Sequence, residues 1–556
     1  MSASYNRSVT DSRLTIARAV AAALSEVGVD HVFGLLGSGN FEITNAFVDC
    51  GARWVPARHE GGAVVMTDAF ARITGRVPAC SVHQGPGFTN TITGLAEAAK
   101  SGTPMLVLAA DSPDSALRSN FRVDQAGLAS AVGALSERLH SPETAVADAL
   151  RAHRRTREER RPVVLSMPID VQAAPAPDAA PDPPPPAWRA PRPSAESLAA
   201  AGRLLAGARR PLIIAGRGAA RAAARRDLEA LADRIGALLA TSAAGHGLFA
   251  GSPWALGISG GFASPTAAGL IREADLVLAF GATLNMWTTR HGRLLGPEAK
   301  VVQVDLDPDA IGSHRPADVG LIGDAAETAR ALAAQVPAQA GWRTAELAGL
   351  IAAGGWRNTP YNDAGADGRI DPRTLSIRLE RMLPAQRTIT VDSGHFMGWP
   401  SMYMEVPDEA GFVFPQAFQA VGLGLAAAVG AAVARPDRLT VSTVGDGGFL
   451  MGVSELETAV RLGLRMLVVA YNDAAYGAEV HHFGPEGRPV HLVQFPDTDL
   501  AAIGRGAGAR AATVRSPDDL APIAEWLAGG AEGVMVVDAK VVPTVVGEWL
   551  PEAFGH

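Results

Sequence analysis

Two acidic residues at the ends of two predicted strands constrain this chain most. An apolar run over residues 439–444 leads into a Gly-Asp-Gly-Gly turn at residues 445–448, and a second run over residues 466–471 ends near Asp473. Two carboxylates at strand ends can share one divalent cation, and Mg2+ completes its oxygen shell with phosphate and water. Glycines let the backbone approach that phosphate closely. Gly-Asp-Gly is also a common turn, so this motif alone leaves both interpretations open.

Helices and short apolar strands alternate along most of the chain, which is typical of parallel α/β sheets. A Pro/Ala-rich segment interrupts this pattern and is expected to be an extended linker. We therefore predict an α/β protein with three parallel-sheet domains. The predicted boundaries are a first domain over residues 1–172, a linker over 173–194, a second domain over 195–337, a connection over 338–370 and a third domain with a C-terminal tail over 371–556.

Composition narrows the class of protein. With 47% hydrophobic and 19% charged residues, the 556-residue chain is expected to be globular and soluble. The formal net charge of -8 gives no reason to expect nucleic acid or an anionic membrane as partner. Only Cys50 and Cys80 are present, so no disulfide framework is implied. The polar residues 1–11 and the absence of a long apolar stretch favour a cytoplasmic protein without a membrane segment.

A second motif lies far upstream of the first. Glu60 stands in a His-Glu-Gly sequence, ahead of a predicted helix over residues 63–73, a strand over 79–82 and a Gly-Pro-Gly turn at 85–87. A glutamate at the start of a helix is ordinarily a surface residue that interacts with the helix dipole. In dry surroundings its carboxyl group would hold a proton more tightly, as acid–base chemistry requires.

In this order, the two motifs resemble the acetolactate synthase-like thiamine diphosphate enzymes, a group that includes 2-hydroxyacyl-CoA lyases, oxalyl-CoA decarboxylases and benzaldehyde lyase. The resemblance covers nearly the whole chain. It implies pyrimidine-binding, central and diphosphate-binding domains, bound thiamine diphosphate and Mg2+, and a homodimer or homotetramer in which Glu60 of one chain faces Asp446 of another. The family pattern ends in Asn-Asn, whereas this chain has Asp473 at the second position, which adds a negative charge and leaves metal binding chemically sound.

The resemblance also implies roles for single residues. Glu60 would hydrogen-bond the aminopyrimidine ring and activate the cofactor, Val421 would wedge between its two rings, and the carbonyl of Gln419 would accept from its amino group. This stretch could alternatively be an ordinary glycine-rich helix start. His395 could donate to the diphosphate or merely cap local backbone. The expected cofactor-binding residues are Glu60, Gly394, His395, Gln419, Val421, Gly445, Gly447, Gly448, Tyr476 and Gly477, and the expected metal ligands are Asp446, Asp473 and Ala475.

The expected catalytic residues besides Glu60 are polar groups near the reacting carbon. Glu479 matches a catalytic glutamate of pyruvate-decarboxylase-like enzymes and could move a proton of the substrate; the alternative is a solvated glutamate on a helix. Ser38 lies in a Gly-Ser-Gly-Asn turn, which could be a plain turn. His83 and Gln84 are expected in the same cavity, where a histidine could transfer a proton near neutral pH, although His83 could equally be an interior residue.

Departures from the family bear on the reaction. Acetolactate synthases carry Thr-Lys where this chain has Gly133 and Ala134, and their flavin-site motif is replaced by Gly-Ala-Thr-Leu-Asn-Met-Trp at residues 281–287. Acetolactate synthesis and FAD binding are therefore disfavoured. The new sequence is somewhat similar to oxalyl-CoA decarboxylases and 2-hydroxyacyl-CoA lyases, which bind CoA in the central domain. Arg217, between two glycines, could meet a phosphate there, though a lone Gly-x-Gly is weak support.

Three functions follow as competing hypotheses. The first is a thiamine diphosphate-dependent C–C lyase or carboligase with a 2-hydroxyacyl-CoA as leading substrate. The second is a 2-oxo acid decarboxylase or acetolactate synthase-like enzyme acting on pyruvate. The third is a non-catalytic regulatory paralogue, against which the intact Glu60, Asp446 and Asp473 speak. The substrate, the reaction direction and the role of the C-terminal tail are left open by the sequence.

Overall fold

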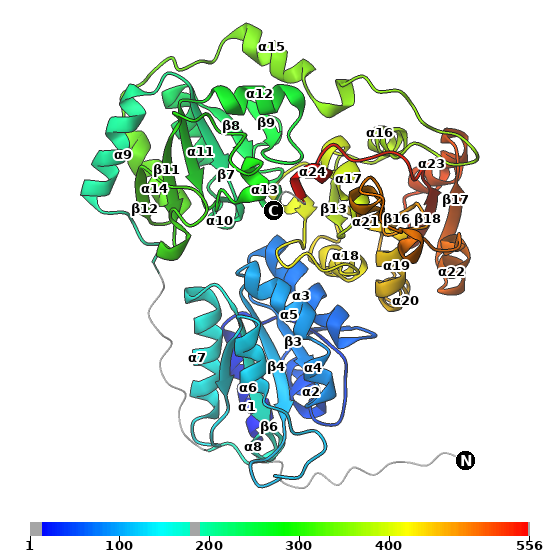
Figure 1. Ribbon diagram of the computed structural model, residues 1–556. Helices are drawn as coiled ribbons and strands as arrows, with labels where there is room; N and C mark the ends of the chain where they lie inside the picture. Colours follow the sequence, from blue (N-terminus) through cyan, green and yellow to red (C-terminus); the bar gives the residue numbers. More distant parts are fainter. Residues whose placement is uncertain (1–13, 178–188, 554–556) are drawn as a thin grey trace. The chain divides into compact units, whose positions relative to one another are not determined.

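The computed structural model describes residues 14–177 and 189–553 (Figure 1). It contains three six-stranded sheets, and every paired strand in them is parallel, which confirms the predicted α/β class. The chain forms two compact units. The first holds the described residues up to 177 together with Gln416–Ala420, and the second holds the remaining described residues.

The first unit has one sheet with the strand order β2-β1-β3-β4-β6-β5. Helix α1 packs against α2 and α7, and α3 packs against α5. The strands are β1 (His31–Gly34), β2 (Arg53–Pro56), β3 (Ala79–Val82), β4 (Met105–Asp111), β5 (Leu135–Arg138) and β6 (Pro162–Pro168). The helices are α1 (Ile16–Glu26), α2 (Phe41–Asp49), α3 (Glu60–Thr74), α4 (Pro86–Thr89), α5 (Ile92–Lys100), α6 (Gln125–Ala131), α7 (Ala145–Glu158) and α8 (Ile169–Ala173).

The second unit contains two sheets, of which the central one has the order β12-β11-β10-β7-β8-β9. Its strands are β7 (Pro211–Ala215), β8 (Leu238–Thr241), β9 (Ala255–Ile258), β10 (Leu276–Phe280), β11 (Lys300–Asp305) and β12 (Val319–Ile322). Its helices are α9 (Ala195–Gly207), α10 (Arg217–Arg221), α11 (Arg225–Ile235), α12 (Pro265–Glu273), α13 (Met286–Thr289) and α14 (Ala325–Gln335), and α15 (Ala345–Ala353) follows in the connection to the next sheet.

The last sheet has the order β14-β13-β15-β16-β18-β17. Its strands are β13 (Arg387–Val391), β14 (Phe412–Val413), β15 (Leu439–Gly445), β16 (Met466–Asn472), β17 (Arg510–Val514) and β18 (Val534–Lys540). Its helices are α16 (Pro372–Met382), α17 (Gly398–Tyr403), α18 (Gly424–Ala434), α19 (Asp446–Gly452), α20 (Ser454–Arg461), α21 (Gly477–Phe483), α22 (Leu500–Gly506), α23 (Ala521–Ala528) and α24 (Leu550–Ala553).

Short 3-10 turns complete the secondary structure: η1 (Ala243–Gly245), η2 (Pro308–Ala310), η3 (Trp356–Asn358), η4 (His395–Met397), η5 (Glu409–Gly411), η6 (His491–Val493) and η7 (Pro517–Leu520). The middle strands β4, β6, β16 and β18 are buried along their whole length, as parallel strands covered by helices on both faces should be. Among the described residues, no helix combines the length and the apolar character that crossing a membrane requires.

The predicted elements and the observed ones differ mainly at their ends. Strand β3 has the predicted bounds, but α3 begins at Glu60, three residues earlier than expected, because the His59 side chain caps it by accepting from the Gly61 amide at 3.0 Å. Residues 178–188 of the predicted linker lie outside the described residues. Just before them, the Ala176 amide donates to the Leu14 carbonyl at 2.6 Å. The predicted domain boundaries stay predictions.

Candidate active site

The predicted metal-binding carboxylates come from neighbouring strands. β15 and β16 are paired with Gly445 opposite Tyr471, so Asp446 and Asp473 both follow the carboxyl ends of adjacent strands. Burial raises the pKa of Asp446 to about 6. Burial and the nearby charge of Asp446 raise the pKa of Asp473 to about 7. A divalent cation would stabilise both groups in their ionised form, so this pair fits the predicted metal.

Three glycines near these carboxylates have no space for a larger side chain. A Cβ at Gly447 would lie 2.6 Å from the Tyr476 ring, and one at Gly448 would lie 2.3 Å from a carboxylate oxygen of Asp392. A Cβ at Gly477 would lie 2.5 Å from Oδ2 of Asp473. No larger residue fits at these positions without displacing a neighbour, which is the property expected of a turn that cradles phosphate.

A pocket of about 200 Å³ opens beside Asp473. The described residues contain no group of three or more His, Cys, Asp and Glu side chains that could hold a metal by themselves. Any cation at Asp446 and Asp473 would therefore draw further oxygens from backbone, phosphate or water, as Mg2+ commonly does. The pocket is lined by Asp473, Ala474, Ala475, Gly477, Val480, Gln494, Phe495 and Pro543.

His395 has one ring nitrogen committed to the backbone. Its Nε2 accepts from the Gly547 amide at 2.9 Å, so the neutral ring carries its proton on Nδ1. Burial and the neighbouring His481 lower the pKa of His395 to about 3. Nδ1 lies 3.4 Å from where a Cβ of Gly477 would stand. The backbone partner of Nε2 is thus distant in sequence rather than local, and donation to a diphosphate through Nδ1 stays a prediction.

Asp392 is a site residue that sequence reasoning missed. It is fully buried at the end of β13, and its carboxylate accepts from the backbone amides of Gly422 and Leu423, each at about 3.1 Å. Burial raises the pKa of Asp392 to about 6 against the opposing effect of these amides. The bonded turn follows Val421, whose side chain is 42% exposed and 3.5 Å from a Cβ built at Gly448. Asp392 therefore lies between the turn that follows Val421 and the glycine turn at Gly448.

The remaining predicted residues of this unit are more exposed. Tyr476 is 38% exposed, and its ring meets Phe495 edge-on at 4.9 Å. Ala475 forms an isolated backbone bridge with Gln494. Glu479 lies half-buried on α21, near its start. Gly394 follows β13 with a φ of 138°, which glycine adopts readily.

In the first unit, Glu60 is nearly buried at the first position of α3. Its Oε2 accepts from Nδ2 of Asn90 at 3.0 Å. A Cβ at Gly87 would lie 3.3 Å from Oε1 of Glu60 and 3.0 Å from Cβ of His83. The Gly-Pro-Gly turn therefore lies between Glu60 and His83, and both side chains lie beside Gly87.

Ser38 and His83 follow β1 and β3, which are neighbours although β2 separates them in sequence. Such a reversal of strand order is where ligands bind in open parallel sheets. His83 Nδ1 lies 2.8 Å from the Gln84 carbonyl, which can only accept, so Nδ1 donates. Nε2 of the neutral ring is then an acceptor, 3.3 Å from Oγ of Ser38.

Gln84 differs from its two neighbours in the predicted cavity. It is 5% exposed, whereas Ser38 is exposed and His83 half-buried. A Cβ at Gly39 would lie only 1.7 Å from its Oε1, an atom that is buried without a hydrogen-bond partner in the described structure. Gln84 thus packs against the Ser38 turn.

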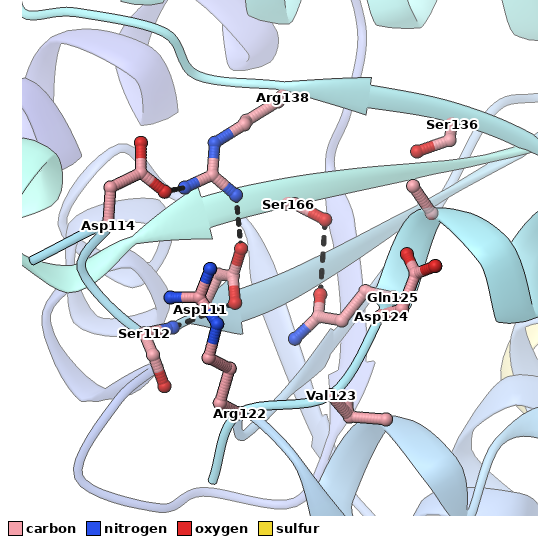
Figure 2. A pocket seen from close by; sticks show the side chains of 11 residues that line it. Asp111, Ser112, Asp114, Arg122, Val123, Asp124, Gln125, Ser136, Arg138 and Ser166 are labelled. Atoms are coloured by element: carbon pink, nitrogen blue, oxygen red, sulfur yellow. Dashed lines mark hydrogen bonds and ion pairs between the residues drawn. The ribbon is translucent and has the colours of Figure 1, made fainter. Parts of the chain in front are cut away.

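Another pocket, about 380 Å³ in volume, lies in the first unit and is lined by residues of β4, β5 and β6 and of the segment after β4 (Figure 2). Its polar groups largely bind one another: Arg138 pairs with Asp111 and, at 2.7 Å, with Asp114, while Ser166 donates to Gln125 at 3.1 Å. These contacts make it a polar pocket whose walls are held by an internal network. The lining residues are Asp111, Ser112, Asp114, Arg122, Val123, Asp124, Gln125, Ala126, Ser136, Arg138 and Ser166.

In the central sheet, the predicted Gly-x-Gly around Arg217 has a packing role. A Cβ at Gly218 would lie 2.7 Å from the Cα of Gly281, and the Gly218 amide donates to the Gly281 carbonyl at 3.1 Å. Two strand-end turns thus meet backbone to backbone, which requires glycines on both sides.

The site residues fall into two groups. Glu60, Ser38 and His83 lie together in the first unit, and Asp446, Asp473, His395 and Gly477 lie together in the second. Three parallel α/β sheets, with an acid at one sheet edge and a glycine-cradled carboxylate pair at another, define an enzyme class that holds a phosphate-bearing cofactor.

Comparison with known proteins names that class. Residues 14–131, 198–332 and 392–539 match the families described as thiamine pyrophosphate enzyme, N-terminal TPP binding domain, central domain and C-terminal TPP binding domain, respectively. The chain belongs to the thiamine pyrophosphate enzymes of the acetolactate synthase type, and it is a thiamine diphosphate-dependent enzyme. The family and the thiamine diphosphate cofactor predicted from the sequence are confirmed, and Mg2+ stays a prediction.

Several relatives align over most of their length. The chain is 33% identical to a probable 2-ketoarginine decarboxylase of Pseudomonas aeruginosa, over 95% of this chain and 94% of that protein. It is 31% identical to a sulfoacetaldehyde acetyltransferase of Rhodobacter capsulatus, over 84% and 83%. It is 28% identical to a probable acetolactate synthase large subunit of Methanocaldococcus jannaschii, over 91% and 88%.

Proposed function

We propose that this enzyme breaks or forms a C–C bond next to a carbonyl group, using thiamine diphosphate anchored through Mg2+. The observation that carries the proposal is the pair Asp446 and Asp473, whose carboxylates share one sheet edge with glycines at positions where no larger residue fits. Bound thiamine diphosphate supplies a nucleophilic carbon and an electron sink for the breaking bond.

The chain's own residues would hold the cofactor in place and transfer protons. Asp446 and Asp473 would hold the metal, and the backbone at Gly447 and Gly448 would approach the diphosphate. Val421, exposed and seated over Gly448, would support the bend of the cofactor. Glu60, nearly buried, would share a proton with the aminopyrimidine ring.

Ser38 and His83 would serve the substrate. Because Nδ1 of His83 is held by the Gln84 carbonyl, Nε2 faces Ser38 and can accept a proton from its hydroxyl or from a substrate oxygen. A histidine whose tautomer is fixed in this way can accept and return a proton at Nε2. Glu479 on α21 would be a second proton carrier, on the diphosphate-binding unit.

For the substrate, we propose a 2-oxo acid. The names of two relatives, a probable 2-ketoarginine decarboxylase and a probable acetolactate synthase, point to chemistry at a carbonyl beside a carboxylate. This favours the hypothesis that the sequence ranked second. The 2-hydroxyacyl-CoA lyase hypothesis rests on the similarity at residues 281–287, and Gly281 also serves close backbone packing.

We also propose that the site is completed by a second copy of the chain, in a homodimer or homotetramer. Apolar side chains are exposed next to residues of both site groups, where a partner would cover them. These side chains are Leu36, Phe41 and Phe121 in the first unit and Val421, Leu450, Met451, Tyr476 and Phe495 in the second. Light scattering of the purified protein tests this point, and a monomer with full turnover would contradict it.

A substrate panel tests the proposed reaction. The enzyme, with thiamine diphosphate and Mg2+, is incubated with 2-oxo acids of increasing side-chain length and, separately, with 2-hydroxyacyl-CoAs. Carbon dioxide release from a 2-oxo acid, with mass-spectrometric detection of the aldehyde or ligated product, is the expected result. Aldehyde release from 2-hydroxyacyl-CoA alone would favour the lyase hypothesis. Cofactor binding without turnover of any compound would support the regulatory paralogue.

Replacing Glu479 by alanine should slow turnover by about 100-fold while leaving thiamine diphosphate affinity unchanged, because the residue is assigned to proton transfer and not to the diphosphate. Steady-state rates and calorimetric titration of the cofactor are measured side by side. The exposed Glu486 in the same region, changed to alanine, is the control. Lost affinity combined with normal chemistry would contradict the assignment.

A further inference from the structure

A buried glutamate outside the predicted site binds the backbone of residues 417 and 418, next to the predicted cofactor contact Gln419. Glu97, on α5, is fully buried, and its Oε2 accepts from the Phe418 amide at 2.7 Å. Its Oε1 accepts from the Ala417 amide at 3.2 Å and from Ser101 Oγ at 2.9 Å. One carboxylate thus binds two successive backbone amides located more than 300 residues further along the chain.

Glu97 is kept ionised in this buried place. Burial alone would raise its pKa, but the Arg72 guanidinium, 2.7 Å from Oε1, and the amides of residues 417 and 418 together hold the pKa of Glu97 below its ordinary value. Arg72 is shared with Asp68, also at 2.7 Å. A charged acceptor makes stronger hydrogen bonds to backbone amides than a neutral one. The strength of the bonds to residues 417 and 418 therefore depends on the charge of Glu97.

The segment bound by Glu97, Gln416–Ala420, belongs to the first unit, although the residues before and after it in sequence belong to the second. The ammonium of Lys100, three residues after Glu97, lies 5.7 Å from the Phe418 ring centre and adds a second contact. The next residue, Gln419, has a φ of 60°, the left-handed region that non-glycine residues rarely occupy. Such strain persists only where the surroundings impose it, and it is common at ligand-binding sites.

We propose that Glu97 is a positioning residue: by holding the amides of Ala417 and Phe418, it fixes the strained backbone at Gln419 so that the Gln419 carbonyl accepts the amino group of the cofactor's pyrimidine ring. This inference rests on the proposed function, since it assigns Gln419 the contact implied by the family. It adds a requirement beyond the cofactor-binding residues themselves: an ionised acid on α5 whose carboxylate binds the amides of Ala417 and Phe418.

The test uses the full-length enzyme with Mg2+ and two cofactors: thiamine diphosphate and the analogue in which oxygen replaces the pyrimidine amino group. The wild type should prefer thiamine diphosphate, because only its amino group donates to Gln419. In Glu97→Gln this preference should fall by about 3- to 10-fold, the size of one neutral hydrogen bond. A merely structural role would weaken both cofactors equally and leave the ratio of their Kd values unchanged, which would overturn the proposal.

Two controls separate the loss of the Glu97 hydrogen bonds from a general loss of stability. Asp68→Asn removes a buried charge from the same arginine without touching the segment, so it should keep the wild-type ratio. If Glu97→Gln does not fold, Phe418→Pro, which lacks the donating amide, is compared with Phe418→Leu, which keeps it; only the proline variant should lose the preference. Equal ratios in this pair would overturn the proposal. A wild type that binds neither cofactor would overturn the proposed function as well.

Discussion

Turnover is expected to fall by about 100- to 10,000-fold when Glu60 is replaced by glutamine, the range that acid–base groups contribute. The amide has nearly the shape of the carboxyl group and can still accept from Asn90, so α3 should keep its start. It cannot exchange a proton with the aminopyrimidine ring. Steady-state kinetics on the best substrate of the panel measure the effect.

Cofactor affinity should change far less than the rate in this variant. The residues proposed to hold the diphosphate and the metal lie in the other unit, and only one hydrogen bond to the pyrimidine is altered, which corresponds to less than about tenfold in Kd. Glu42→Gln, an exposed glutamate in the first turn of α2, is the matched control and should behave as wild type. Near-normal turnover of Glu60→Gln would remove Glu60 from the proposed mechanism.

The fold was predictable from the sequence because parallel strands are short, apolar and regularly separated by helices. The position of the two acids was also predictable. Asp446 and Asp473 follow β15 and β16, and the carboxyl ends of neighbouring parallel strands lie at one edge of the sheet. Ser38 and His83 lie within hydrogen-bonding distance because β1 and β3 are neighbours, and the shared cavity stays a prediction.

Sequence reasoning failed where a residue acts on distant backbone. Asp392 follows a strand just as Asp446 does, yet no glycine motif marks it, and its partners at Gly422 and Leu423 lie about 30 residues further along. Glu97 offers even less signal, since a lone glutamate in an alanine-rich helix reads as a solvated residue. Both carboxylates bind amides, and the amino-acid sequence does not show which amides a fold brings near.

Removing the Asp446 carboxylate is expected to weaken thiamine diphosphate binding in Mg2+ by at least about 100-fold, since groups that only support a metal ligand already contribute 10- to 100-fold. Asp446→Ala is compared with Asp473→Asn by calorimetric titration. The asparagine keeps a side-chain oxygen and restores the residue usual in the family, so its affinity should stay within about tenfold of wild type. The ratio between the two variants separates loss of a ligand from loss of a charge.

A second measurement on the same variants needs no cofactor. Burial disfavours ionisation of both carboxylates and raises the pKa of Asp446 to about 6, and the charge of Asp446 adds to burial in raising the pKa of Asp473 to about 7. Removing either charge should therefore leave the thermal stability of the cofactor-free protein at pH 8 equal or higher. If the two acids serve metal binding, replacing them should weaken cofactor affinity and should not destabilise the fold. A lower Tm in both variants, with cofactor affinity unchanged, would make these acids structural and would remove the observation on which the proposed function depends.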